Sequence, residues 1–123
     1  MAATRYLDDA RYLLVGGRLE RAVSRAYYAA YQAMWSALGD PPSGGQWRHL
    51  GIISFFVRGH WLEPSHPRTG PGILEHLRLP LHRLYQSRID VDDDLVSPDI
   101  ARARECLETA EITVAEIRRG AQG

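Results

Sequence analysis

The chain contains no lysine, so all 15 of its cationic side chains are arginines. Fifteen Asp and Glu residues balance them, and no net charge draws the whole chain to nucleic acid. An arginine nevertheless offers a planar fork to a phosphate, a carboxylate or an aromatic ring, where a lysine offers only a point charge. What matters for recognition is therefore where individual arginines lie.

Cysteine is almost absent as well. The single one, Cys106, excludes an internal disulfide and belongs to no zinc-binding pattern. It stands next to an apolar position of the last expected helix, and we expect a packed, unreactive thiol. We also predict no bound cofactor.

Long apolar runs are missing. No stretch approaches the ~20 apolar residues that span a bilayer. The first residues, MAATRYLDDARYLL, carry two arginines and two aspartates within a segment that a secretory signal would keep apolar. We therefore expect a cytoplasmic protein with no membrane association. At 123 residues the chain is long enough for one domain, residues 1–123, with its own core.

The apolar periodicity predicts helices and no strands. The expected helices cover residues 4–15, 18–38, 47–59 and 71–88, and a last segment from 97 onward. We expect Thr4 to cap the first helix, Ser97 and Pro98 to start the last, and Pro80 to kink or split the fourth. Long helices with short links and one apolar stripe each indicate an all-α fold, an antiparallel up-and-down bundle of four to five helices.

Two expected helices have defined core positions. In the third helix these are Leu50, Ile53, Phe56 and Val57, and in the last they are Ile100, Ala103, Leu107, Ala110, Val114 and Ile117. Phe55 must then face away from the core. This extra apolar position indicates either a partner or dimer contact, or cover by the proline-rich link 61–72, and the sequence leaves both open.

The segment SRAYYAAYQAMW, residues 24–35, belongs to the second expected helix, which separates into two stripes. The apolar stripe consists of Leu19, Ala22, Val23, Ala26, Tyr27, Ala30, Met34 and Ala37. The polar stripe consists of Arg18, Arg21, Arg25, Tyr28 and Gln32. We expect Tyr27 to be buried, with its hydroxyl reaching a polar partner.

The polar stripe has two interpretations. Arginine forks and an aromatic ring are typical of a site for a phosphate or a nucleotide base. The same stripe could instead be an ordinary surface, with its charge balanced by Asp8, Asp9 or Glu20.

An acidic run precedes the last expected helix, and it consists of Asp90, Asp92, Asp93 and Asp94. The run lacks the glycine and the distal glutamate of a calcium-binding loop. Carboxylates just before a helix are favourable without any metal. We predict no metal site.

Three segments match the pattern of one known family. SRAYYAAYQAM is similar to a signature helix, and QWRHLGIISFFVRGHWL to a stretch with a family histidine, at His49. LYQSRIDVDDDLVSPDIARARECLETAEITVAEI is similar to a turn and final helix, with Arg88 and Asp92 on the family's arginine and aspartate. Together, in this order, they resemble the HEPN domain family of small all-helical proteins over nearly the whole chain.

The resemblance implies a helical bundle that commonly dimerises. Many members of the family are encoded beside a minimal nucleotidyltransferase and bind it or its nucleotide. Others are metal-independent RNA-cleaving toxins, with an arginine followed four to six residues later by a histidine. In this chain no histidine lies in that window after Arg88 or Arg83, and Asp93 replaces the tyrosine that follows the family's aspartate.

We therefore predict a homodimeric, non-catalytic subunit that pairs with a separately encoded minimal nucleotidyltransferase, in a module of the toxin–antitoxin type. Its expected ligand is ATP, another nucleotide or RNA. The predicted nucleotide-binding residues are Arg25, Tyr28, His49, Arg88 and Asp92.

Two alternatives stay open. In a metal-independent endoribonuclease toxin with a degenerate motif, His49 would deprotonate the 2′-hydroxyl and Arg88 would stabilise the charged phosphorane. The carboxylates beside Arg88 speak against this chemistry because they repel a phosphate backbone. A structural interaction module without a nucleotide site is the other alternative.

Overall fold

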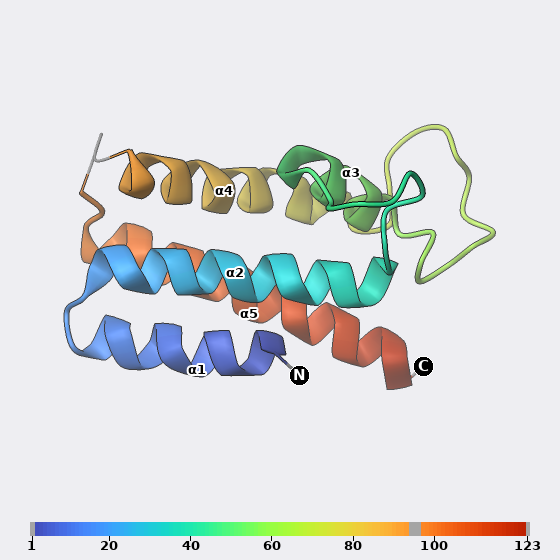
Figure 1. Ribbon diagram of the computed structural model, residues 1–123. Coiled ribbons are helices and arrows are strands. Elements are labelled where there is room, and N and C mark those ends of the chain that lie inside the picture. The colour runs from blue at the N-terminus through green and yellow to red at the C-terminus, as the bar shows by residue number, and fades with distance from the viewer. Residues whose placement is uncertain (1, 94–96, 123) are drawn as a thin grey trace.

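The computed structural model describes residues 2–93 and 97–122 (Figure 1). These residues form five α-helices, one short 3-10 helix and no strand. The elements are α1 (Ala2–Val15), α2 (Leu19–Leu38), α3 (His49–Arg58), η1 (Glu75–Leu77), α4 (Arg78–Asp92) and α5 (Ile100–Gln122). The expected all-α class is confirmed for the described part of the chain. None of its helices has an apolar stretch long enough to cross a bilayer.

The central element is α2, which contacts each of the other four α-helices. Figure 1 shows α1 on one side of it, α4 on the other, and α5 crossing behind. The apolar stripe predicted for α2 is confirmed, because Ala22, Val23, Ala26, Tyr27, Ala30 and Met34 are buried while Leu19 and Ala37 are half-buried. Ala29, Tyr31 and Ala33 are buried too. Alanines on several sides of α2 let the neighbouring helices approach it closely. Only a short face of α2 remains outside the core, and its position is fixed by this packing.

Two predicted helix starts are wrong. Thr4 lies inside the first turn of α1, where its hydroxyl accepts a hydrogen bond from Arg118 Nη2 instead of capping the helix. At the start of α5, Asp99 Oδ1 accepts the backbone N–H of Arg102 at 2.7 Å, so Asp99 is the N-cap in place of Ser97.

The helix predicted over 71–88 is divided into η1 and α4, but the division falls before Pro80 and not at it. The fourth α-helix begins at Arg78 rather than at 71, so Pro80 lies in its first turn, where no intrahelical bond needs a backbone N–H. Glu75 fixes this start, since its carboxylate accepts hydrogen bonds from the backbone of Gly72 and from the Arg78 side chain. The helix continues to Asp92, beyond the predicted end at Arg88. This extension places Arg88 and Asp92 one turn apart on one face.

Two predicted core positions are wrong. Leu50 is 55% exposed and Ile100 is 49% exposed. In α3 the inward positions are Ile52, Ile53, Phe56 and Val57, and His49 precedes them on the same face, so Leu50 points outward. The other predicted positions of α5 are buried. Phe55 faces away from the core as expected and remains 52% exposed beside the Trp47 ring, so the link 61–72 does not bury it.

Candidate functional site

The candidate site is centred on Arg88 of α4, whose guanidinium lies against two tyrosines of α2. Its Cζ is 5.0 Å from the ring centroid of Tyr27 and 5.1 Å from that of Tyr28. Its Nη2 donates a hydrogen bond of 3.0 Å to the Tyr28 hydroxyl. Two aromatic contacts and one hydrogen bond fix the plane of the cation.

Asp92 completes the surroundings of Arg88. One carboxylate oxygen lies 3.2 Å from Arg88 Nε, and the arginine side chain is only 20% exposed. The Nε–H is buried and is not aligned into a hydrogen bond with any described residue, so the pair is electrostatic rather than a formed bond. Arg88 is thus a cation whose position is fixed and whose charge is partly screened by Asp92.

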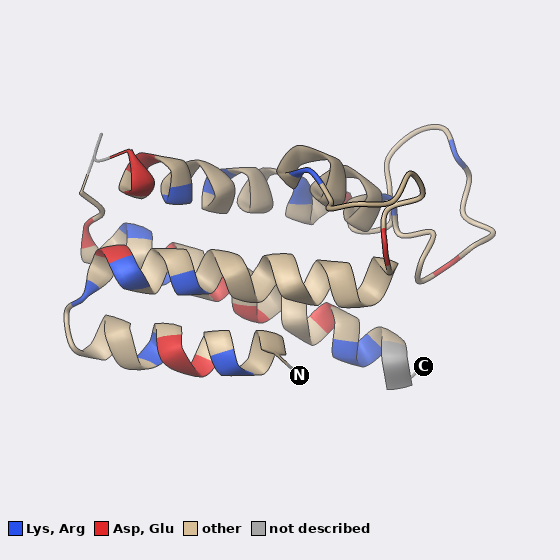
Figure 2. Ribbon diagram, viewed as in Figure 1, with Lys and Arg blue, Asp and Glu red and all other residues tan. Residues whose placement is uncertain are grey.

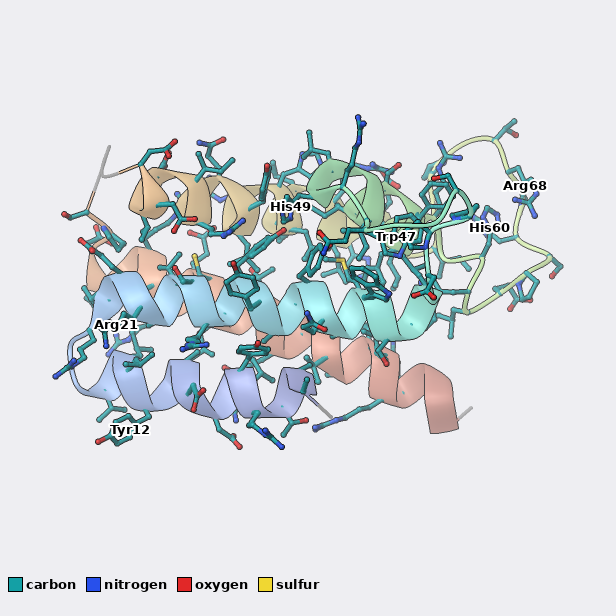
Figure 3. All side chains as sticks on the ribbon, in the orientation of Figure 1. Tyr12, Arg21, Trp47, His49, His60 and Arg68 are labelled. Carbon is teal, nitrogen blue, oxygen red and sulfur yellow. The ribbon has the colours of Figure 1, made fainter. Side chains whose placement is uncertain are left out.

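His49 is the first residue of α3 and lies between α2 and α4 (Figure 3). Three tyrosine rings surround its imidazole, with ring centroids 5.4, 5.1 and 5.0 Å away, and they belong to Tyr27, Tyr31 and Tyr85. The Tyr27 hydroxyl and His49 Nδ1 share a hydrogen bond. The expectation that the buried Tyr27 finds a polar partner is therefore confirmed.

The electrostatics of this pair favour its neutral form. Burial lowers the pKa of His49, and the positive charge of Arg88 lowers it further. Burial also raises the pKa of Tyr27 above its ordinary value, with Arg88 acting in the opposite direction. At neutral pH we therefore expect an uncharged imidazole beside a protonated phenol.

The second ring nitrogen of His49 is open to solvent. Within the described residues Nε2 has no hydrogen-bond partner, and it is not among the buried unpaired atoms. If the Tyr27 hydroxyl donates to Nδ1, Nε2 carries the proton and is a donor. If Nδ1 donates, Nε2 is an acceptor and could serve as a base.

Arg25 lies on the α1 side of Tyr28. Its Cζ is 5.7 Å from the ring centroid of Tyr6 in α1, and the Tyr6 and Tyr28 centroids are 5.9 Å apart. An open hollow of about 410 Å³, which we call the arginine hollow, is formed here by Glu20, Arg21, Ser24, Arg25, Tyr28 and Val91. Arg25 and Arg88 thus lie on either side of Tyr28.

The interpretation of the arginines as a charge-balanced surface is met in part by Glu20, which lines the hollow beside them without forming an ion pair. Among the described residues no carboxylate lies within ion-pair distance of Arg21 or Arg25. Asp8 pairs instead with Arg11. The Glu20 carboxylate lies 3.5 Å from the Ser97 hydroxyl.

The structure brings the predicted site residues into one connected row. Arg25, Tyr28, Arg88 and His49 follow one another through the rings of Tyr6, Tyr28 and Tyr27, with Asp92 beside Arg88. The sequence alone did not indicate Tyr6, Tyr31 or Tyr85 as site residues. Tyr85 stands three residues before Arg88 and so shares its helix face, a spacing that could have revealed it.

The remaining candidates lie apart from this row. Cys106 is buried, and burial raises the pKa of its thiol, as expected of an unreactive cysteine. Among the residues that the structure describes, no three His, Cys, Asp or Glu side chains gather as a metal ion would require. Asp94 of the acidic run lies outside the described residues.

Comparisons with known proteins add no family to this geometry. No protein-family model, no curated protein and no solved structure matches the chain. The resemblance to the HEPN family rests on the three sequence segments and stays a prediction.

Proposed function

We propose that this protein is a non-catalytic, HEPN-like helical subunit that binds a nucleotide or RNA and pairs with a separately encoded minimal nucleotidyltransferase. The observation that carries the binding role is the arginine hollow, in which the lining residue Tyr28 is hydrogen-bonded to Arg88. The partner and the homodimer rest on the sequence resemblance alone. The cytoplasmic location rests on the polar N-terminal segment and the lack of long apolar runs, and the antiparallel up-and-down arrangement rests on the helix pattern of the sequence.

The chemistry of the hollow suits a phosphate group. Arg21 and Arg25 are exposed and have no ion-pair partner in the described chain, so their forks are free to bind phosphate oxygens. The Tyr28 hydroxyl accepts from Arg88, so its own hydrogen is available for donation to an anion. Arg88 orients this donor and adds positive charge.

Ligand-induced stabilisation tests the site. A ligand that binds only the folded chain raises the free energy of unfolding, by about 2.7 kcal/mol at a hundredfold excess over Kd. We expect ATP or a short RNA to raise the thermal midpoint, and Arg25→Ala and Tyr28→Phe to weaken this rise. Arg104→Ala, an exposed arginine of α5, is the matched control and should leave the rise intact. A midpoint that no nucleotide and no RNA moves would refute the proposal.

The proposed partner has its own test. A minimal nucleotidyltransferase encoded beside this chain should co-purify with it. A gene that stands alone removes this part of the proposal and leaves the nucleotide site untouched.

One observation favours a ribonuclease as the second candidate. Tyr27 contacts His49 through its hydroxyl and Arg88 through its ring face, so a neutral imidazole and a fixed cation lie on the same side chain. These are the base and the phosphorane-stabilising group that metal-free RNA cleavage needs. Cleavage of unstructured RNA that disappears in both His49→Asn and Arg88→Ala would establish this candidate and overturn the non-catalytic role.

A further inference from the structure

One side of α2 carries a row of polar and aromatic residues along most of its length. Arg21, Arg25, Tyr28, Gln32 and Trp35 recur at intervals of four and three, which places them on one side of the helix, and we call this the polar face of α2. The arginines are exposed and the other three are half-buried. Figure 2 shows the charged residues of α2, acidic as well as basic, toward its end near the turn to α1, and only uncharged residues along the rest of the helix.

The arginine hollow forms one end of this face. Arg21, which Figure 3 shows near the turn between α1 and α2, lines it together with Arg25 and Tyr28. Phosphate groups are the chemistry that two arginines and a hydroxyl donor recognise. A single mononucleotide would fill this end alone.

A second hollow lies at the other end of the face and has a different chemistry. Its volume is about 470 Å³, and we call it the tryptophan hollow, lined by Ala2, Ala3, Gln32, Trp35, Ser36 and Gln46. The described residues that line it include no cation and no carboxylate, so they offer a phosphate no charged partner. It offers one indole ring, two side-chain amides and a hydroxyl.

The indole at this end is held in place before any ligand arrives. Trp35 Nε1 donates to Asp40 Oδ1 at 3.1 Å, and the ring stands edge-on to Tyr31 with centroids 5.8 Å apart. An oriented indole beside two amides, each a donor and an acceptor, fits a planar base that stacks and hydrogen-bonds along its edge. Ring stacking of this kind binds unpaired bases of any sequence.

We propose that the polar face of α2 binds a short single strand of RNA, with backbone phosphates at Arg21 and Arg25 and an unpaired base against Trp35, Gln32 and Gln46. This inference rests on the proposed function and names its ligand class: a strand several nucleotides long rather than a mononucleotide. At ~1.5 Å per residue the face is about 21 Å long. That length holds about six nucleotides at the ~3.4 Å spacing of a stacked strand, and fewer in an extended one.

Carboxylates border the face and contribute to its charge. Asp40 is engaged by the Trp35 indole. Glu20 lines the arginine hollow and faces the proposed phosphates. Because a carboxylate there repels the backbone, Glu20→Gln should strengthen RNA binding.

The test compares a six-nucleotide uridine RNA, followed by fluorescence anisotropy, with UMP as its competitor. We expect Trp35→Leu to weaken binding of the hexamer by about fivefold or more because stacking is lost. Gln46→Ala should weaken it through a lost hydrogen bond, and both variants should leave UMP binding unchanged. Arg25→Ala should weaken both ligands and lower the salt dependence of hexamer binding by about 0.7 in log–log slope. Trp61→Leu, another half-buried indole outside the face, is the matched control for Trp35. Gln46 is exposed, so its variant keeps the test valid if Trp35→Leu fails to fold.

The outcomes separate the two proposals. In one outcome, the hexamer and UMP bind with equal strength, in a way that depends on Arg25 but not on Trp35 or Gln46. That result overturns the single-strand proposal and leaves the proposed nucleotide site intact. Absence of binding for both ligands overturns the strand and the proposed function together.

Discussion

The guanidinium of Arg88 lies over the ring of Tyr27, with Cζ 5.0 Å from the ring centroid, and joins α4 to the central helix. Tyr27 is only 2% exposed, and its hydroxyl is bonded to His49. One core residue therefore positions both the cation and the imidazole of the candidate site. Changes at the site should alter stability as well as binding.

Replacing Arg88 with lysine tests this coupling. An ammonium keeps the charge near Asp92 but loses the planar contacts with Tyr27 and Tyr28 and the aligned hydrogen bond. We expect Arg88→Lys to lower the free energy of unfolding by about 1 kcal/mol, as measured by urea denaturation. Arg83→Lys is the control on the same helix, because Arg83 is half-exposed and pairs with Glu105 at the surface. Equal stability of the Arg88 variant and the wild type would show that the stacked geometry contributes nothing.

The lowered pKa of His49 predicts a pH effect with a definite sign. Burial and Arg88 disfavour the charged imidazole in the folded chain, so below the ordinary histidine pKa of ~6.5 the unfolded chain binds the proton more readily. The free energy of unfolding should therefore fall as the pH drops from ~6.5 through the folded-state pKa. Below that pKa this group adds no further loss.

His49→Asn isolates the contribution of this histidine, since an amide can replace Nδ1 in the bond to Tyr27 but does not titrate. Urea unfolding at pH 7.5 and 5.5 should show a smaller loss for the variant than for the wild type. Parallel losses in the two proteins would mean that His49 titrates alike in the folded and unfolded chains.

The sequence predicted the core side of α2 because alanines and large apolar residues recur there at helical spacing. It failed at Leu50 because hydropathy alone places a leucine inward, whereas Tyr27, Tyr31 and Tyr85 provide an aromatic box that takes His49 instead. That box combines two helices far apart in the chain. No periodicity within α3 reveals it.

The contacts of the candidate site are likewise of two kinds: those within one helix follow from the sequence, and those between helices do not. Arg25 and Tyr28 share one helix, so their proximity follows from spacing. The contact of Arg88 with Tyr28 and that of Arg25 with Tyr6 join different helices, and a single sequence does not show which helices are neighbours. Helix ends were harder still, since Asp99 and Ser97 are both good caps and only the structure shows which one bonds.

Two adjacent phenylalanines, one buried and one exposed, allow a matched test of how much core packing contributes to stability. Phe56 is fully buried and stacks on Trp61 with centroids 5.2 Å apart, whereas Phe55 is 52% exposed. Phe56→Ala should cost about 3–5 kcal/mol because it leaves a cavity in the core. Phe55→Ala should cost less than about 1 kcal/mol, measured in the same denaturation assay. If the loss at Phe55 matches that at Phe56, or grows with protein concentration, Phe55 is covered by a second molecule.

Replacing either of two glycines with alanine should change stability, in opposite directions for the two positions. A Cβ built at Gly72 meets the backbone oxygen of Val57 at 2.3 Å, because the chain after Gly72 runs against the end of α3 and Leu74 donates its N–H to that same oxygen. Backbone cannot move aside as a flexible side chain can, so Gly72→Ala should lower stability by about 1–3 kcal/mol. In Gly51→Ala, the control, the nearest atom to the added Cβ is Arg48 Cβ at 3.9 Å, and better helix propensity should raise stability by up to ~1 kcal/mol. Thermal midpoints of the two variants should therefore lie on opposite sides of the wild type. A rise for Gly72→Ala would mean that the link does not follow α3 as closely as the fold requires.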